Sequence, residues 1–284
     1  MSDIRTFVVG VDASEESSAA LTWTRSVAGP EDRIVLVHAW EIPLMTGYDV
    51  VLAVDIGEME QVAKQGLDDL IDDLDDERLV AAARRGHAGR TLVDEGADAE
   101  LIVVGHRGSS RLSLMLGSTA NYVLHHTETP VVVVRGEHPV APPRRVVVGV
   151  DDFDDPDDSP SVRALQWAMR LPGVDTVGAV HAWFLPPLAV GMYHPGSADL
   201  VAMDAAARRV VDRIVEAAGA APDGVTVTAS VARGTGGLAL IEASEEADLV
   251  VVGSRGRGGF SELVLGSTTA ETAAHSHCPV AVVR

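Results

Sequence analysis

The chain of 284 residues repeats itself once along its whole length. The segment FVVGVD at Phe7–Asp12 returns as VVVGVD at Val146–Asp151, and VHAW at Val37–Trp40 returns at Val180–Trp183. The separation between matching residues grows along the chain, from 139 residues at Asp12 and Asp151 to 149 residues at the prolines of PVVVVR and PVAVVR. Offsets that only grow indicate two colinear copies, the second with small insertions. We therefore predict two domains, residues 1–137 and 144–284.

Each copy alternates apolar, β-branched runs with helical patterns. The runs predict strands near residues 6–12, 33–39, 78–84, 101–105 and 130–135, and near 145–151, 174–182, 225–232, 248–253 and 279–284. Most runs are continuously apolar, which is typical of a parallel sheet covered on both faces. Apolar residues recur at helical spacing over 59–74 and 200–218, and Asp68–Asp76 reads as a solvated charge run. The predicted fold is α/β, with two tandem doubly wound domains that each hold a five-stranded parallel sheet.

Composition excludes several classes of function. A net charge of −20 argues against nucleic acid and anionic membrane surfaces as partners. The chain has one cysteine, Cys278, so we expect a reducing compartment and a buried, inert thiol. The N-terminus lacks a signal-peptide pattern, and no apolar run approaches the roughly 18 residues of a spanning helix. These observations predict a cytoplasmic protein.

A glycine pattern follows the fourth predicted strand of each copy. It reads Gly-x-x-Gly and then Gly-Ser-Thr, with nine residues between at Gly256 and Gly266 but only eight between Gly108 and Gly117. Glycines at a strand end allow a ligand near the backbone, and a helix opened by Gly-Ser-Thr offers free N–H groups to an anion. If strands one and four are neighbours, Asp12 or Asp151 faces the same crevice and accepts bonds from a sugar hydroxyl or a base amine.

Glycines and hydroxyls in this pattern also have simpler roles. The glycines could serve only to make a turn, and Gly-Ser-Thr is also a common helix start. A P-loop is excluded because the sole lysine, Lys64, follows Ala63 rather than glycine. The dinucleotide fingerprint is excluded because the first strands are followed by GVDAS and GVDDF. The pattern therefore favours a phosphate-bearing ligand without naming it.

These residues resemble a tandem universal stress protein over essentially the whole chain. That family's ATP signature is Gly-x-x-Gly, nine residues, then Gly-Ser/Thr, which the second copy matches in full and the first misses by one residue. The resemblance implies ATP, with Mg²⁺, as the ligand of a stress-response regulatory protein with little or no turnover, at most a weak ATPase. The implied ligand-binding residues are Asp12, Ala39, Gly105, Arg107, Gly108, Gly117, Ser118 and Thr119, and Asp151, Ala182, Gly253, Arg255, Gly256, Gly266, Ser267 and Thr268. It also implies pairing through the last strands, Val131–Val134 with Val280–Val283 inside one chain, or a homodimer.

Several alternative functions stay open. The same fold could serve as a nucleotide-free interaction scaffold, or as a slow nucleotide hydrolase, although no general base or nucleophile–base pair is evident. An acidic loop, Asp151–Asp158, follows the first strand of the second copy and would repel a triphosphate unless Mg²⁺, Arg255 or Arg257 intervenes. The histidines before the last strands fit no strong zinc spacing, and no metal ligands are assigned. Whether one or both sites fill is also open.

Overall fold

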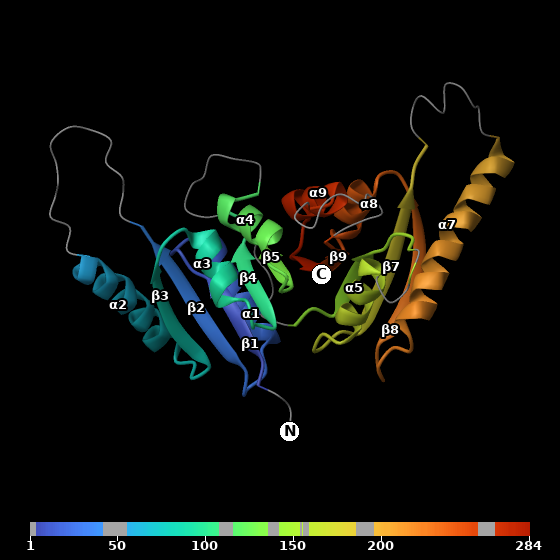
Figure 1. The fold of residues 1–284 in the computed structure, drawn as a ribbon. Coiled ribbons are helices and arrows are strands. Elements are labelled where there is room, and N and C mark those ends of the chain that lie inside the picture. Colours follow the sequence, from blue (N-terminus) through green and yellow to red (C-terminus); the bar gives the residue numbers. More distant parts are fainter. Residues whose placement is uncertain are drawn as a thin grey trace, which may run out of the picture. The chain divides into compact units, whose positions relative to one another are not determined.

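The computed structural model describes residues 4–41, 56–107, 116–135, 142–153, 155, 159–185, 196–254 and 265–284. The chain divides into two compact units, Met1–Val134 and Arg135–Arg284, each with its own strands and helices (Figure 1). Each predicted strand is found, with ends that differ by at most two residues, which is within the usual uncertainty of element boundaries.

The first unit is a parallel sheet with the strand order β3-β2-β1-β4-β5. Its strands are β1 (Thr6–Gly10), β2 (Arg33–Trp40), β3 (Leu79–Arg85), β4 (Leu101–Gly105) and β5 (Val131–Val134). The helices between them are α1 (Glu15–Val27), α2 (Ile56–Leu74), α3 (Ala88–Glu95) and α4 (Ser118–His126). Strand order reverses between β1 and β4, which pair directly, so the condition set for strands one and four in the sequence analysis is met.

The second unit repeats this topology with the order β8-β7-β6-β9-β10, again with parallel neighbours. Its strands are β6 (Arg145–Gly149), β7 (Thr176–Trp183), β8 (Thr226–Arg233), β9 (Leu249–Gly253) and β10 (Val280–Val283). Its helices are α5 (Pro160–Met169), α7 (Ser197–Ala218), α8 (Gly236–Ala243) and α9 (Ser267–His275). The fold is therefore α/β, with two tandem doubly wound domains.

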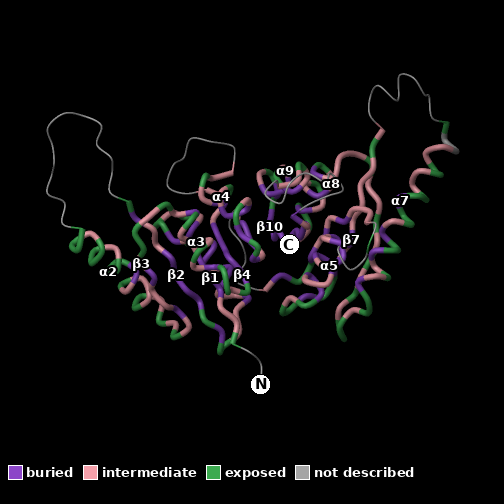
Figure 2. The backbone as a smooth tube through the Cα atoms, viewed as in Figure 1, coloured by how far each residue is buried: buried purple, intermediate pink, exposed green. Residues whose placement is uncertain are grey.

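Helices cover both faces of each sheet. Right-handed crossovers in this strand order place α1 and α2 on one face of the first sheet and α3 and α4 on the other. Contacts of two successive residues of β4 agree with this arrangement. Gly105 lies against α1 on one face, whereas Val104 lies near Gly10 and Leu92 of α3 on the other face. The central strands are accordingly buried along most of their length: Phe7–Val9 of β1 and Leu101–Val104 of β4 are all buried (Figure 2).

One predicted surface residue is instead part of a buried ion cluster. Asp76 lies just beyond α2, and its side chain is only 8% exposed. It accepts hydrogen bonds from Arg25 Nε at 2.8 Å and from Arg78 Nε at 2.9 Å. The hydrogen bonds from Arg78 hold the pKa of Asp76 well below its usual range. The prediction of a solvated charge run is therefore wrong at Asp76, because the chain turns there and brings two arginines to it.

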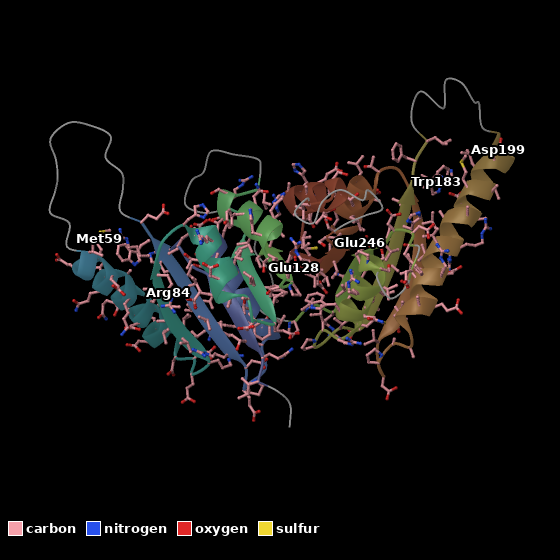
Figure 3. All side chains as sticks on the ribbon, viewed as in Figure 1. Met59, Arg84, Glu128, Trp183, Asp199 and Glu246 are labelled. Atoms are coloured by element: carbon pink, nitrogen blue, oxygen red, sulfur yellow. The ribbon has the colours of Figure 1, made fainter. Side chains whose placement is uncertain are left out.

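The two units differ at the ends of their second strands. In the second unit, Trp183 (labelled in Figure 3) donates from Nε1 to Asp204 Oδ1 of α7 at 3.0 Å. Asp204 also forms an ion pair with Arg233. In the first unit, the Trp40 indole nitrogen is buried and has no hydrogen-bond partner among the described residues. The repeat is thus close in topology and distinct in its side-chain contacts.

Candidate functional site

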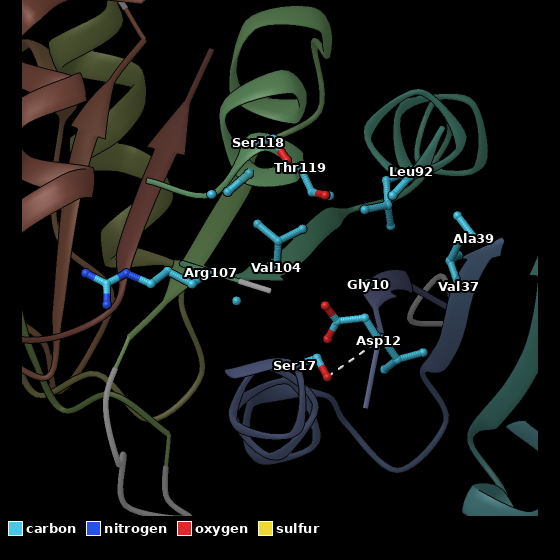
Figure 4. A pocket seen from close by; sticks show the side chains of 15 residues that line it. Gly10, Asp12, Ser17, Val37, Ala39, Leu92, Val104, Arg107, Ser118 and Thr119 are labelled. Atoms are coloured by element: carbon cyan, nitrogen blue, oxygen red, sulfur yellow. Dashed lines mark hydrogen bonds between the residues drawn. The ribbon is translucent and has the colours of Figure 1, made fainter. Parts of the chain in front are cut away.

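The first unit has a cavity at the carboxyl ends of its strands, where strand order reverses. The cavity measures about 220 Å³, several times the roughly 30 Å³ that a water molecule occupies, so it is larger than a packing void (Figure 4). Its lining includes these residues that the sequence had singled out: Asp12, Ala39, Gly105, Arg107, Gly117, Ser118 and Thr119. Gly108 lies outside the described residues.

Asp12 stands in the loop that joins β1 to α1. The sequence placed it at the strand end, but β1 ends at Gly10, so Asp12 belongs to the turn. Its Oδ1 accepts hydrogen bonds from the backbone N and the Oγ of Ser14, at 3.1 and 2.5 Å. Ala13 between them has a φ of +60°, a left-handed backbone rare for a residue with a Cβ. The tight turn directs the Asp12 side chain toward the cavity (Figure 4).

The glycines after β4 have packing roles in this structure. A Cβ at Gly105 would lie 2.8 Å from the Glu16 backbone of α1, and one at Gly117 would lie 3.2 Å from the Arg107 Cα. Gly117 N also donates to His106 O at 2.8 Å, which closes the chain into the start of α4. The glycines thus let α1 and α4 approach β4 closely, and their backbone lines the cavity as a result.

Three helices begin beside the cavity. Residue Ala88 at the start of α3 and Ser118 at the start of α4 line it, and so does Ser17 in the first turns of α1. Helix N-termini carry partial positive charge and N–H groups without intrahelical partners. The N-cap of α4 is Gly117, which has no side chain to occupy those groups. This edge of the unit is therefore suited to an anion despite the net charge of −20.

Arg107 contributes less than the sequence suggested. Arg107 lines part of the cavity, but its guanidinium points away from Asp12 and Ser118 (Figure 4). The Arg107 Nε is buried and has no hydrogen-bond partner among the described residues. A direct contact with a ligand in the cavity would require another rotamer of this side chain.

The sequence did not predict the apolar wall of the cavity. Leu92 of α3, Val104 of β4 and Val37 of β2 line the cavity together with the polar groups. A Cβ at Gly10 would lie 3.0 Å from Leu92 Cδ1, so the missing side chain leaves room for Leu92. The lining residues that the sequence analysis missed are Gly10, Val11, Ser17, Val37, Ala88, Leu92, Val104 and Ala120. The one useful signal was the apolar spacing of α3, which by itself indicates packing rather than a site.

The second unit places the matching residues at the matching edge. β6 pairs with β9, so the loop that holds Asp151 lies beside the strand that ends at Gly253. Gly266 N donates to Ser254 O at 3.2 Å, as Gly117 does to His106, and Ser267 and Thr268 then open α9. Ala182 lies near the end of β7, as Ala39 does in β2. Arg255 and Gly256 lie outside the described residues.

Comparison with known proteins agrees with this architecture. The model of the Universal stress protein family matches residues 3–135 and again 143–284. The chain belongs to the universal stress protein family. A universal stress protein of Mycolicibacterium smegmatis is 32% identical over 98% of this chain and 96% of its own length. One from Mycobacterium tuberculosis is 33% identical over 98% of this chain and 95% of its own.

Solved structures bear out the fold. A universal stress protein from Archaeoglobus fulgidus superposes with a TM-score of 0.65, at 22% identity and 98% coverage of both chains. A second structure, from Pseudomonas aeruginosa and described as a putative universal stress protein, gives a TM-score of 0.64 at 15% identity, over 99% of this chain and 93% of its own. At such identities the likeness concerns architecture alone.

In this universal stress protein, the described part of the acidic loop is tied to α7. Asp152 forms an ion pair with Arg213, whose guanidinium carbon lies 4.9 Å from the centre of the Phe153 ring. Asp151 Oδ1 accepts from Asp152 N at 2.8 Å. Asp154, Asp157 and Asp158 lie outside the described residues. At least one carboxylate of the loop is therefore neutralised by a neighbouring helix.

The remaining polar residues have structural contacts. His125 and His126 bond through Nδ1 to the backbone oxygens of Asn121 and Tyr122, and the His126 ring stacks on Tyr122 at 4.0 Å. Among the described residues, no group of three or more His, Cys, Asp or Glu side chains could hold a metal ion. Cys278 is buried, as predicted. A search of the described helices finds none with the length and apolarity to cross a membrane.

Proposed function

We propose that the cavity of the first unit binds ATP together with Mg²⁺, and that the second unit holds a matching site. The chain is then an ATP-binding regulatory protein of the stress response with little or no turnover. The observation that carries this proposal is the meeting of helix N-termini, an apolar wall and a carboxylate at one cavity. Those are the groups that the phosphates, base and sugar of a nucleotide each need.

The phosphate end would lie at α4. The backbone N–H groups of its first turn are free of intrahelical partners, and the hydroxyls of Ser118 and Thr119 stand beside them. The helix dipole adds about 0.3–1 kcal/mol for an anion placed there. These N–H and hydroxyl donors can bind the oxygens of a triphosphate. A bound Mg²⁺ would neutralise part of the phosphate charge.

The nucleoside end would lie between β1, β2 and α3. Leu92, Val104 and Val37 offer an apolar surface to one face of a base. Asp12 can accept a hydrogen bond from a sugar hydroxyl or a base amine, and the backbone of Ala39 lies along the same wall. An apolar cavity with a few polar groups is the usual form of a small-molecule site.

Slow or absent turnover is consistent with the lining. Asp12 is the only carboxylate among the described lining residues, and Ser14 already engages its Oδ1. General-base catalysis needs a basic group free to take a proton near the attacking water. A protein with one occupied carboxylate there is better suited to holding ATP than to hydrolysing it.

The alternative is a nucleotide-free scaffold of the same fold. Two observations favour this alternative. Gly105 is explained by its close packing against α1, and the Arg107 guanidinium points away from Asp12 and Ser118, so neither residue requires a ligand. Under this alternative, substitutions at the cavity leave partner binding unchanged.

Two further predictions from the sequence remain proposals. They are the pairing of the last strands, within one chain or between two chains, and a cytoplasmic location.

The test uses a pair of variants in the full chain that are matched in size and differ in charge. Thr119→Glu puts a carboxylate in the first turn of α4, where it suits the helix dipole but repels phosphate, and Thr119→Gln is its neutral control. We expect calorimetry to show MgATP affinity at least about tenfold weaker for Thr119→Glu than for Thr119→Gln, because the control loses the same hydroxyl but adds no negative charge. Equal affinities in the two variants would contradict a phosphate site at α4.

The same pair at Thr268 addresses the second unit. Thr268→Glu should abolish binding at the second site alone, which is the site that still binds MgATP in Thr119→Glu. If Thr268→Glu changes nothing while Thr119→Glu abolishes binding, the first unit holds the sole site. Release of phosphate at a rate that Asp12→Ala and Asp151→Ala abolish, with binding retained, would favour the hydrolase instead.

A further inference from the structure

The peptide that joins Val11 to Asp12 is held on both sides. Val11 N continues the sheet by donating to Val37 O at 3.0 Å. Val11 O lies 2.9 Å from the Nδ1 of His38 in β2, and Asp12 N donates to Ser17 Oγ of α1 at 3.3 Å. Each polar atom of this peptide therefore has a partner, although β1 has already ended at Gly10.

The second unit holds the equivalent peptide in the same way. Val150 N donates to Val180 O at 2.9 Å, and His181 Nδ1 lies 2.9 Å from Val150 O. Asp151 N donates to Ser161 Oγ at 2.8 Å. The two units thus use the same three contacts for an aspartate at the same edge of the sheet.

The loops that reach this arrangement differ in length and composition. Ser17 follows Asp12 by five residues, whereas Ser161 follows Asp151 by ten, across the acidic loop. A contact that recurs in two loops of unequal length is not a by-product of local chain geometry. The recurrence indicates that both units hold the aspartate peptide in the same position.

The chemistry of the contact fixes the form of the histidine. A backbone carbonyl oxygen only accepts hydrogen bonds, so Nδ1 of His38 and of His181 must carry the proton. In the neutral ring, Nε2 is then unprotonated. Ser17 Oγ accepts from Asp12 N and donates to Ser14 O at 3.0 Å, so the serine joins the aspartate to the N-cap of α1.

We propose that His38 with Ser17, and His181 with Ser161, are positioning residues that fix where the carboxylates of Asp12 and Asp151 stand. This inference rests on the proposed function, because it assigns the carboxylates to a nucleotide. The histidines and serines act chiefly through the backbone, and His181 Nδ1 also lies 4.0 Å from Asp151 Oδ1. Their removal frees the turn that aims each carboxylate.

Calorimetry with MgATP tests the histidine in the full chain carrying Thr268→Glu, so that the first site is titrated alone. Asn places its side-chain N–H close to where Nδ1 of histidine stands, whereas Gln places it closer to Nε2. We expect His38→Asn to bind within about twofold of its parent, and His38→Gln and His38→Ala to bind about fivefold to tenfold more weakly. Parental affinity in all three variants, or the same loss of affinity in all three, would overturn the positioning role.

A second readout needs no nucleotide and separates this inference from the proposed function. In imidazole ¹⁵N spectra of the unsubstituted chain, neutral His38 and His181 should be protonated at Nδ1. The Asp12 amide should exchange with solvent faster in Ser17→Ala and His38→Ala than in His38→Asn. Protonation at Nε2, or equal exchange rates in folded variants, contradicts the positioning role of His38 and Ser17. A chain that passes these tests but binds no MgATP contradicts the proposed function alone.

Discussion

Gly105, the last residue of β4, lies directly against Glu16 in the first turn of α1. A Cβ at Gly105 would be 2.8 Å from the Glu16 backbone, closer than real Cβ contacts come. In the second unit, a Cβ at Gly253 would likewise be 2.8 Å from Pro160 of α5. The absence of a side chain at the strand end therefore sets where the first helix of each unit begins. That helix carries Ser17 or Ser161, which bind the aspartate peptides.

Gly105→Ala is expected to destabilise the first unit by about 1–3 kcal/mol, because the added methyl meets backbone that cannot move aside by a rotamer change. It should also weaken MgATP binding to the first site, since α1 would shift from β4. Urea denaturation followed by hydrogen exchange measures the first effect, and calorimetry measures the second.

Gly66→Ala is the matched control for that substitution. Gly66 lies within α2, and a Cβ there would have no atom within 4 Å. Alanine should stabilise this helix by about 0.5–1 kcal/mol. If Gly105→Ala is as neutral or stabilising as Gly66→Ala, the close approach of α1 to β4 is not real.

Asp76→Asn should lower the stability of the first unit at neutral pH by about 1–3 kcal/mol, because it leaves two partly buried arginines without their anion. The folded pKa of Asp76 lies below its ordinary value of 3.8, chiefly through the hydrogen bonds of Arg78. The stabilisation is therefore complete above that value and is lost as the pH falls toward the folded pKa. Denaturant unfolding at several pH values, read in the first unit by hydrogen exchange, measures this.

Asp72→Asn provides the comparison, since Asp72 is exposed on α2 and should change stability by less than about 0.5 kcal/mol. The difference between the Asp76 variant and the parent should shrink as the pH drops below 3.8, where the parent's carboxylate protonates in the unfolded chain. A difference that stays constant down to strongly acid pH would contradict the ion cluster.

Cys278 should react slowly with thiol reagents until the second unit opens. Burial raises the pKa of this thiol to about 11, and its relative exposure is 4%. At pH 8 the thiolate is therefore scarce as well as shielded, and labelling should be at least about 100-fold slower than in the denatured chain. Maleimide labelling followed by mass spectrometry measures the rate, and rapid labelling of the native chain would contradict the buried site.

The sequence predicted the sheet well because buried parallel strands are long apolar runs. Strands such as Leu101–Gly105 and Val131–Val134 are recognisable from composition alone. The repeat then predicted the second unit from the first. Asp12 and the Gly-Ser-Thr segment could be placed at one edge because the carboxyl ends of parallel strands meet there.

Other features depended on contacts between segments far apart in the chain. The role of Gly105 depends on Glu16, and the burial of Asp76 depends on Arg25, 51 residues earlier. Leu92 belongs to the cavity only because α3 packs over β1. None of these pairs has a local spacing signal, so the sequence could name the polar half of the candidate site and not its apolar half.

The central claim is that this chain holds ATP, and mass spectrometry of freshly purified, denatured protein tests it most directly. The chain should be purified without added nucleotide, and the released small molecules quantified per chain. We expect ATP or ADP at up to two molecules per chain, and less in the combined Thr119→Glu, Thr268→Glu variant than in its glutamine counterpart. No released nucleotide, together with no heat of binding at millimolar MgATP, would contradict the account.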